Sequence, residues 1–192
     1  GSVGSVPPEA EIGIPFDPDQ AAEWLAEAGY PNGAGLPTIR LGYNASERHA
    51  NIAQAVQKMW GDYLGATVEL AAWEGAGYPD AAHGGDFNVY RWGWGMDYPD
   101  ANNIHAELFH SNLGHEVILK NAEYDALIDR AGRETDLATR EALYAQAEKI
   151  LCQDEVGIVP FFASSSNIVI APHLDRLLVP SYVQEWWNWE IN

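Results

Sequence analysis

The sequence has 192 residues, 47% of them hydrophobic, which is enough for a domain with a sizeable core and argues against disorder. The formal net charge is −18, from 28 acidic and 10 basic residues, so we expect no nucleic-acid partner, because such a surface repels phosphate. The charge suits a cationic or zwitterionic ligand, although acidity can also serve solubility alone. No apolar run is long enough to span a membrane, and no basic segment followed by an apolar one indicates a signal peptide.

The first part of the sequence predicts a linker and then a helix. Residues 1–16 are rich in Gly, Pro, Ser and Val and lack periodicity, which is typical of a leader or linker. Asp17 can cap a helix whose first turn contains Pro18, and Gly29 is expected to end it. Trp24 lies on the apolar face of this helix.

Strands and a long helix are predicted next. Alternating apolar residues predict a strand over 38–43, and Ser46 is a good cap for a helix that runs to about Leu64. Its buried face is expected to contain Ile52, Val56, Met59, Trp60 and Tyr63. Further strands are predicted over 67–73 and, with many aromatic residues, over 87–94.

The later part is mainly helical by its periodicity. Residues 104–109 are expected to be helical, and Asn121 and Asp136 are expected to cap two amphipathic helices. Strands are predicted over 156–163 and 167–170. Strands that alternate with helices indicate an α/β domain with a sheet covered on both faces.

The histidines and the single cysteine do not indicate a metal or redox site. His105, His110 and His115 are five residues apart, whereas metal ligands on one helix face are three or four apart, so no metal is expected. Cys152 lies in an apolar helical run and is expected to be a buried, inert thiol. Catalytic signature motifs are missing from the sequence, so we expect neither an enzyme nor a cofactor.

The segment 87–100 is the most informative part of the sequence. A strand leads Trp92 and Trp94 into a loop with two glycines that ends at the carboxylates Asp97 and Asp100. Ligands bind at the carboxyl ends of strands in open α/β sheets, indoles offer stacking surface, and Asp97 could accept hydrogen bonds from a ligand ammonium. The alternative is a packed aromatic strand followed by ordinary turn chemistry.

Five segments, in order and with natural spacing, carry a resemblance to a known family. They are 17–31 (DPDQAAEWLAEAGYP), 85–89 (GDFNV), 94–100 (WGMDYPD), 124–128 with 140–148 (YDALI and REALYAQAE), and 159–162 (VPFF). Together they resemble the family-5 extracellular solute-binding proteins, which include the oligopeptide-, dipeptide- and nickel-binding proteins of ABC importers. The resemblance covers roughly residues 15–192.

The resemblance implies a fold. Family members have two lobes that close on a ligand, and this chain is similar mostly to the second lobe, which is of the periplasmic-binding-protein type II kind. It implies an α/β lobe over 17–170, with a mixed sheet flanked by helices. The irregular tail over 171–192, which carries Trp186, Trp187 and Trp189, would complete the absent first lobe in a full-length protein.

The resemblance also implies a site. In peptide-binding members the Asp of the tryptophan-containing loop holds the α-ammonium of the peptide, and aromatic residues line the cleft. Asp97 and Trp94 match these positions, and Trp92 and Tyr98 are added as ligand-binding candidates. The sequence departs from the family pattern at Ala101-Asn102, where many members have a proline and a different turn.

The function implied is that of the substrate-binding component of an ABC transporter. It would capture oligopeptides or a similar small solute in the periplasm or on the outer cell surface, with or without a lipid anchor, and dock on a membrane permease. One alternative is a nickel or other metal carrier of the same family. Another is a carbohydrate-acting enzyme or lectin module, suggested by eight Trp and nine Tyr, which predicts a β-rich fold.

Overall fold

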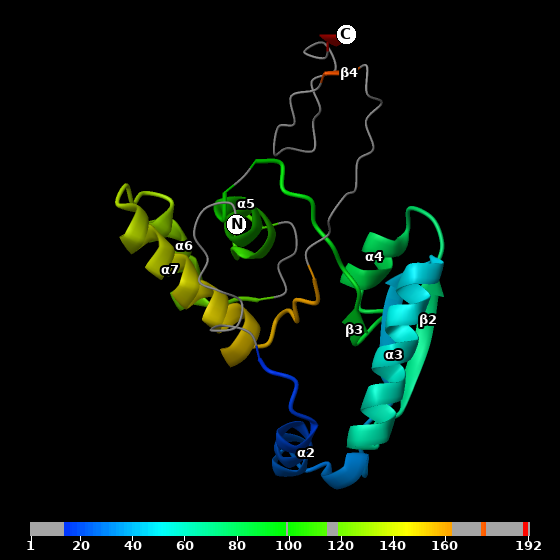
Figure 1. Cartoon of the computed structure of the whole chain (residues 1–192). Helices are drawn as coiled ribbons and strands as arrows, with labels where there is room; N and C mark the ends of the chain where they lie inside the picture. The colour runs from blue at the N-terminus through cyan, green and yellow to red at the C-terminus, as the bar shows by residue number, and fades with distance from the viewer. Residues whose placement is uncertain (1–13, 99, 115–118, 163–173, 176–189, 192) are drawn as a thin grey trace. The chain divides into compact units, whose positions relative to one another are not determined.

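A computed structural model describes residues 14–98, 100–114, 119–162, 174–175 and 190–191 of the chain (Figure 1). These residues fall into two compact units, one over Phe16–Gly93 and the other mainly from Trp94 onward. Within the described residues, no helix has the length and apolar character needed to cross a membrane. The predicted limits of the lobe and the tail, at residues 17, 170 and 171, remain predictions.

The Phe16–Gly93 unit is built on a small parallel sheet. Its strands are β1 (Ile39–Asn44), β2 (Val68–Trp73) and β3 (Val89–Tyr90), in the order β2-β1-β3. Central β1 pairs Ile39 with Val68 on one side and Leu41 with Val89 on the other. The strands predicted over 38–43 and 67–73 are confirmed, whereas the strand predicted over 87–94 is limited to two residues.

The helices of this unit start at the residues whose side chains can cap them. The Asp17 carboxylate accepts a hydrogen bond from the amide of Gln20, and the Ser46 hydroxyl accepts one from the amide of His49. Gly65 ends the long helix with a φ of 67°, a left-handed conformation that glycine adopts without strain. The helical segments are α2 (Pro18–Glu27), η1 (Pro31–Gly33), α3 (Glu47–Leu64) and α4 (Tyr78–His83).

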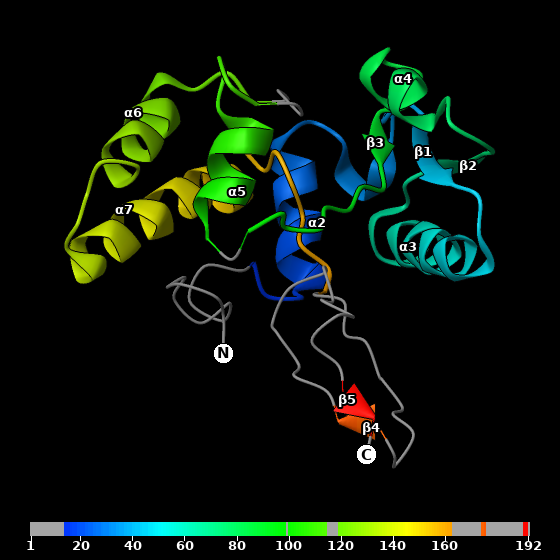
Figure 2. The same ribbon diagram turned by 90° about the horizontal axis from the view of Figure 1, so that it is seen from above.

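Helices cover both faces of the sheet (Figure 2). This was predicted from the alternation of strands with helices along the sequence. Helix α3 packs on the face that carries Leu41, Tyr43 and Val68, and α4 packs on the face that carries Phe87. A side chain at Gly42 would collide with the Phe87 ring, so this position of β1 requires glycine. The α/β fold class is thereby confirmed, and the β-rich fold of a carbohydrate-binding module is not what the described residues form.

The apolar faces of α2 and α3 are covered only in part by described residues. Val56 is buried on α3, but Met59 and Tyr63 are 37% and 52% exposed, so the predicted buried face of this helix was too wide. Trp24 on α2 is 54% exposed. The residues of α3 that join the core with the sheet are Ala50, Ala53, Val56 and Trp60, and Met59 and Tyr63 are not among them.

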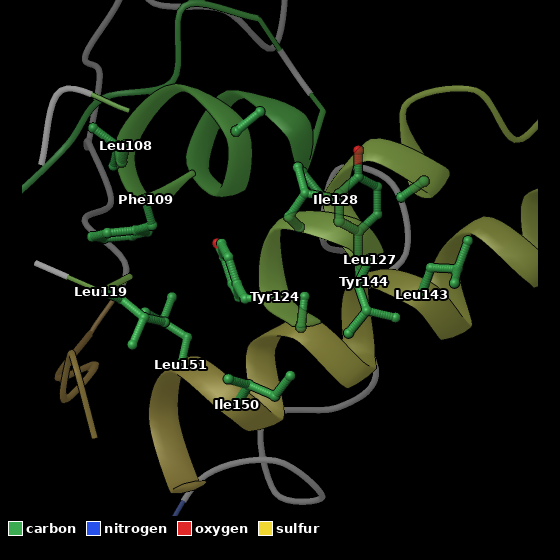
Figure 3. Packing of buried hydrophobic residues seen from close by; sticks show 14 of the residues in the cluster. Leu108, Phe109, Leu119, Tyr124, Leu127, Ile128, Leu143, Tyr144, Ile150 and Leu151 are labelled. Carbon is green, nitrogen blue, oxygen red and sulfur yellow. The ribbon is translucent and has the colours of Figure 1, made fainter. Parts of the chain in front are cut away.

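The unit that begins at Trp94 is helical and has its own core. Asn121 and Asp136 cap two helices, as predicted. Buried side chains of these helices pack around Tyr124 and Tyr144, which are both fully buried (Figure 3). The elements are α5 (Asn102–Ile104), the π-helix η2 (His105–Phe109), α6 (Ala122–Ala131), α7 (Leu137–Lys149), the π-helix η3 (Ile150–Asp154), and the antiparallel pair β4 (Leu174–Asp175) and β5 (Glu190–Ile191).

The strand predicted over 156–163 is not formed by the described residues of that segment, which end at Phe162. Val156 has a φ of 48°, which is incompatible with extended backbone, and Val159 and Phe161 are 64% and 66% exposed. A strand needs a neighbour for its hydrogen bonds, and none of the described strands pairs here. The strand predicted over 167–170 and most of the tail from 171 lie outside the described residues.

Candidate ligand-binding site

The loop of residues 94–100, called the ligand loop below, follows β3 in the chain and leads into α5. Its residues are described except for residue 99. Trp94 is 40% exposed and Tyr98 is 37% exposed, and Asp97 is exposed as well. The loop therefore presents an indole, a phenol and a carboxylate to solvent from one short stretch of chain.

The buried side chain of Asn103 is hydrogen-bonded to two residues of the ligand loop. This residue of α5 is fully buried. Its Oδ1 accepts hydrogen bonds from the indole Nε1–H of Trp94, at 3.0 Å, and from the backbone N–H of Asp97, at 3.2 Å. Its Nδ2 donates to Oε2 of Glu107, at 2.9 Å. All the polar atoms of this side chain are thus satisfied by specific partners, as a buried amide requires.

The Tyr98 hydroxyl belongs to the same network. It donates to Oε1 of Glu107 at 2.7 Å and lies 3.0 Å from Nδ2 of Asn102, which donates to it. Burial raises the pKa of Tyr98, and the bond to the Glu107 carboxylate raises it further. The hydroxyl is therefore a protonated donor whose direction is fixed by Glu107.

Asp100 closes the ligand loop through an ion pair with α7. Its two carboxylate oxygens accept hydrogen bonds from Arg140 at 2.8 and 2.7 Å, and one of them also accepts from the amide of Asn102. The bonds from Arg140 hold the pKa of Asp100 below its ordinary value. Because this bidentate pair satisfies the carboxylate, Asp100 is a structural residue and is not free to bind a ligand.

Asp97 differs from Asp100 in its side-chain partners. Its backbone is fixed by Asn103, but among the described residues no side chain or amide bonds its exposed carboxylate. Arg140 of α7, which reaches the loop, pairs with Asp100 and not with Asp97. The Asp97 carboxylate can therefore accept hydrogen bonds from an external cation such as an ammonium group.

Trp92 has different surroundings from the three candidates in the ligand loop. It belongs to the Phe16–Gly93 unit, where it stacks on Tyr78 with ring centroids 5.9 Å apart and contacts Tyr90 edge-on. Its Nε1 is buried and has no hydrogen-bond partner among the described residues. The network of Asn103 joins Trp94, Asp97 and Tyr98, and Trp92 is not part of it.

Two of the histidines considered as metal ligands are buried in the core of their unit. The ring of His105 stacks on Tyr144, and its Nδ1 is 3.1 Å from the hydroxyl of Tyr124. His110 lies near the carboxylates of α6. His115 lies outside the described residues, and within the described part of the chain no three metal-ligating side chains gather. Cys152 is buried, as predicted, and burial raises its pKa to about 12.

The sequence motifs of this chain match a protein family. The profile of the bacterial extracellular solute-binding proteins, family 5, middle part, matches residues 2–115, which is more than half of the chain. The chain belongs to this family. The resemblance stated from five short segments is confirmed, and residues 94–100 lie inside the matched region.

Relatives of this family-5 chain carry the names of binding proteins. The oligopeptide-binding protein OppA of Bacillus subtilis is 35% identical over 158 residues, and the periplasmic murein peptide-binding protein MppA of Escherichia coli is 34% identical over 155 residues. These alignments cover 81% of this chain and 29% and 28% of the relatives. The chain thus spans less than a third of the length of the relatives it matches.

Solved structures of family members have the same fold as the matched part. The Escherichia coli murein tripeptide-binding protein MppA aligns with a TM-score of 0.69 and 32% identity, over 78% of this chain and 30% of that protein. The Haemophilus influenzae OppA in complex with the peptide RPPGFSPFR aligns with a TM-score of 0.68 and 28% identity, over 82% of this chain and 31% of that protein. The expectation of a fold of the periplasmic-binding-protein kind is confirmed by these similarities.

Proposed function

We propose that this chain is part of the substrate-binding component of an ABC importer that captures oligopeptides by their N-terminal ammonium. The observation that carries the proposal is the exposed Asp97 carboxylate, whose backbone is anchored while its oxygens have no partner among the described residues. Trp94 and Tyr98, exposed in the same loop, offer apolar and stacking surface to the first residues of a peptide.

The named relatives support a peptide ligand but do not decide it. OppA and MppA are named for oligopeptides and murein peptides, whereas a relative from Escherichia coli, 35% identical over 153 residues, is named a probable deoxycholate-binding protein. One scaffold therefore accommodates different ligands, and the choice has to come from the site. A carboxylate without a cation favours a ligand that brings its own positive charge.

The wider role of the protein follows from the same proposal. The peptide would be enclosed between this lobe and another one, contributed by sequence outside the matched third of the relatives, and the closed form would dock on a permease in the membrane. Residues 17–170 would form the second lobe and residues 171–192 would complete the first. The relatives named periplasmic support an extracytoplasmic location. The same relatives are named as binding proteins, which supports a role in ligand binding and not in catalysis.

Calorimetry on the protein expressed from its complete reading frame tests this proposal. A tripeptide such as trialanine is titrated in its free form and in its N-acetylated form, which lacks the ammonium. Asp97→Asn should weaken binding of the free peptide by about 2–5 kcal/mol, the usual effect of removing one partner of an enclosed charged pair. Asp86→Asn, the same change at an exposed position outside the loop, is the control and should leave the affinity unchanged. Equal affinity of the Asp97 variant and the unaltered protein would contradict the ammonium role.

A further inference from the structure

Asn103 accepts hydrogen bonds from two of the three loop residues proposed to meet the ligand, Trp94 and Asp97, yet it is too buried to meet the ligand itself. Its side chain is fully buried under the loop. One oxygen, Oδ1, receives the indole Nε1–H of Trp94 at 3.0 Å and the backbone N–H of Asp97 at 3.2 Å. A carbonyl oxygen has two lone pairs, so these two donors use its full capacity.

The orientation of this amide is determined by a third contact. Nδ2 donates to Oε2 of Glu107, whose other oxygen accepts from the Tyr98 hydroxyl. If the amide turned over, Nδ2 would face two N–H donors and Oδ1 would face a carboxylate, which leaves buried polar groups unpaired. Glu107 therefore keeps Oδ1 directed at the ligand loop.

We propose that Asn103 is a positioning residue, which fixes the Trp94 indole and the Asp97 backbone so that the loop is preorganised for an ammonium ligand. This inference rests on the proposed function of Asp97. A site whose groups are already held in place spends less free energy on ordering when the ligand binds. Without Asn103, residues 94 and 97 lose the hydrogen bonds that hold the Trp94 indole and the Asp97 backbone, so the position of the Asp97 carboxylate is less well ordered.

Three variants of the complete protein separate positioning from general stability. Asn103→Leu keeps the approximate volume but removes the acceptor. The double variant Asn103→Asp with Glu107→Gln keeps an acceptor for Trp94 and Asp97, reverses the hydrogen bond between positions 103 and 107, and conserves the net charge. Asn103→Ser is a milder change, whose hydroxyl is too short to reach both donors, and it serves if the leucine variant does not fold.

Two readouts are measured on each variant. The first is the ratio of the dissociation constants of N-acetyl-trialanine and trialanine, which reports whether the carboxylate still selects an ammonium. The second is the exchange with water of the Trp94 indole N–H, followed by magnetic resonance after selective labelling of tryptophan and assigned with Trp94→Phe. In Asn103→Leu the ratio should fall about tenfold or more, and indole exchange should rise about tenfold, as for one lost hydrogen bond. The double variant should restore both.

The proposal is overturned if Asn103→Leu, or Asn103→Ser in its place, weakens both peptides equally and leaves the ratio unchanged, because a merely structural residue would do that. It is also overturned if the double variant restores neither readout. A ratio near one in the unaltered protein has a different meaning: it rejects the ammonium role of Asp97. Even then, unchanged indole exchange in Asn103→Leu rejects positioning by Asn103, and faster exchange that the double variant reverses supports it.

Discussion

The guanidinium of Arg140 binds both carboxylate oxygens of Asp100, with Nη1 2.8 Å from Oδ2 and Nη2 2.7 Å from Oδ1. The same guanidinium donates through Nε to the carbonyl of Ala131, at the end of α6, and lies over the ring of Tyr144. One arginine thus connects the ligand loop with both helices of the core. Bidentate pairs of this kind are among the stronger interactions of side chains.

Replacing Asp100 by Asn should destabilise the unit that begins at Trp94. We expect the free energy of unfolding in urea to fall by about 1.5–3 kcal/mol, the range for hydrogen bonds to charged groups. Because the pKa of Asp100 is lowered in the folded state, its contribution is present above the ordinary carboxyl pKa and is lost as the pH falls through the folded value. Asp62→Asn, in an exposed pair with Lys58 on α3, is the control and should have a much smaller effect. An equal decrease in the free energy of unfolding for the two variants would show that the Asp100–Arg140 pair stabilises the protein no more than an exposed surface pair.

His105 should make stability depend on pH in a higher range. Burial lowers its pKa from 6.5 to about 4, so between these values the unfolded chain binds a proton that the folded protein does not. Stability should therefore fall by about 1.4 kcal/mol for each pH unit below 6.5, until the folded ring is protonated near pH 4. His105→Gln keeps a polar group beside Tyr124 and should remove this part of the slope. Parallel pH profiles of the two proteins in chemical unfolding would contradict the assignment.

Leu151 and Leu137 offer a matched pair for the core of Figure 3. Leu151 is 1% exposed among the aromatic side chains of the core, whereas Leu137 is 69% exposed at the start of α7. Leu151→Ala should cost about 2–5 kcal/mol because it leaves a cavity that neighbours fill only in part. Leu137→Ala removes the same atoms from a solvent-exposed position and should change the unfolding midpoint little. Similar losses at both positions would mean that the core does not lie where the structure has it.

Local chemistry made the helix starts predictable from the sequence. Asp17, Ser46, Asn121 and Asp136 each cap a helix with a side-chain oxygen, as expected. Capping involves residues two or three positions apart, so its signal is contained in a short stretch of sequence. The strands over 38–43 and 67–73 were predictable because their alternation reflects the two faces of one sheet.

Features that depend on distant residues were not predictable. The strand predicted over 156–163 has suitable composition, but Val156 is left-handed and no described strand pairs with the segment. Asp97 and Asp100 look alike in the sequence, and only Arg140, forty positions away, makes Asp100 structural. Asn103 carries no local signal of its role, because that role depends on the path of the ligand loop.

The 192-residue chain by itself should bind peptides far more weakly than the protein expressed from its complete reading frame. It spans under a third of its named relatives, so under the proposed function it holds one side of the cleft. A peptide on one lobe keeps much of its hydration but still loses translational freedom, which leaves little net affinity. The acidic chain should retain only weak association with cationic peptides that fades with salt. Calorimetry of trialanine and trilysine at low and high salt, with sedimentation to record the oligomeric state, measures this. Tight, stoichiometric and salt-independent binding by a monomer of this chain would show that the site is complete without a second lobe.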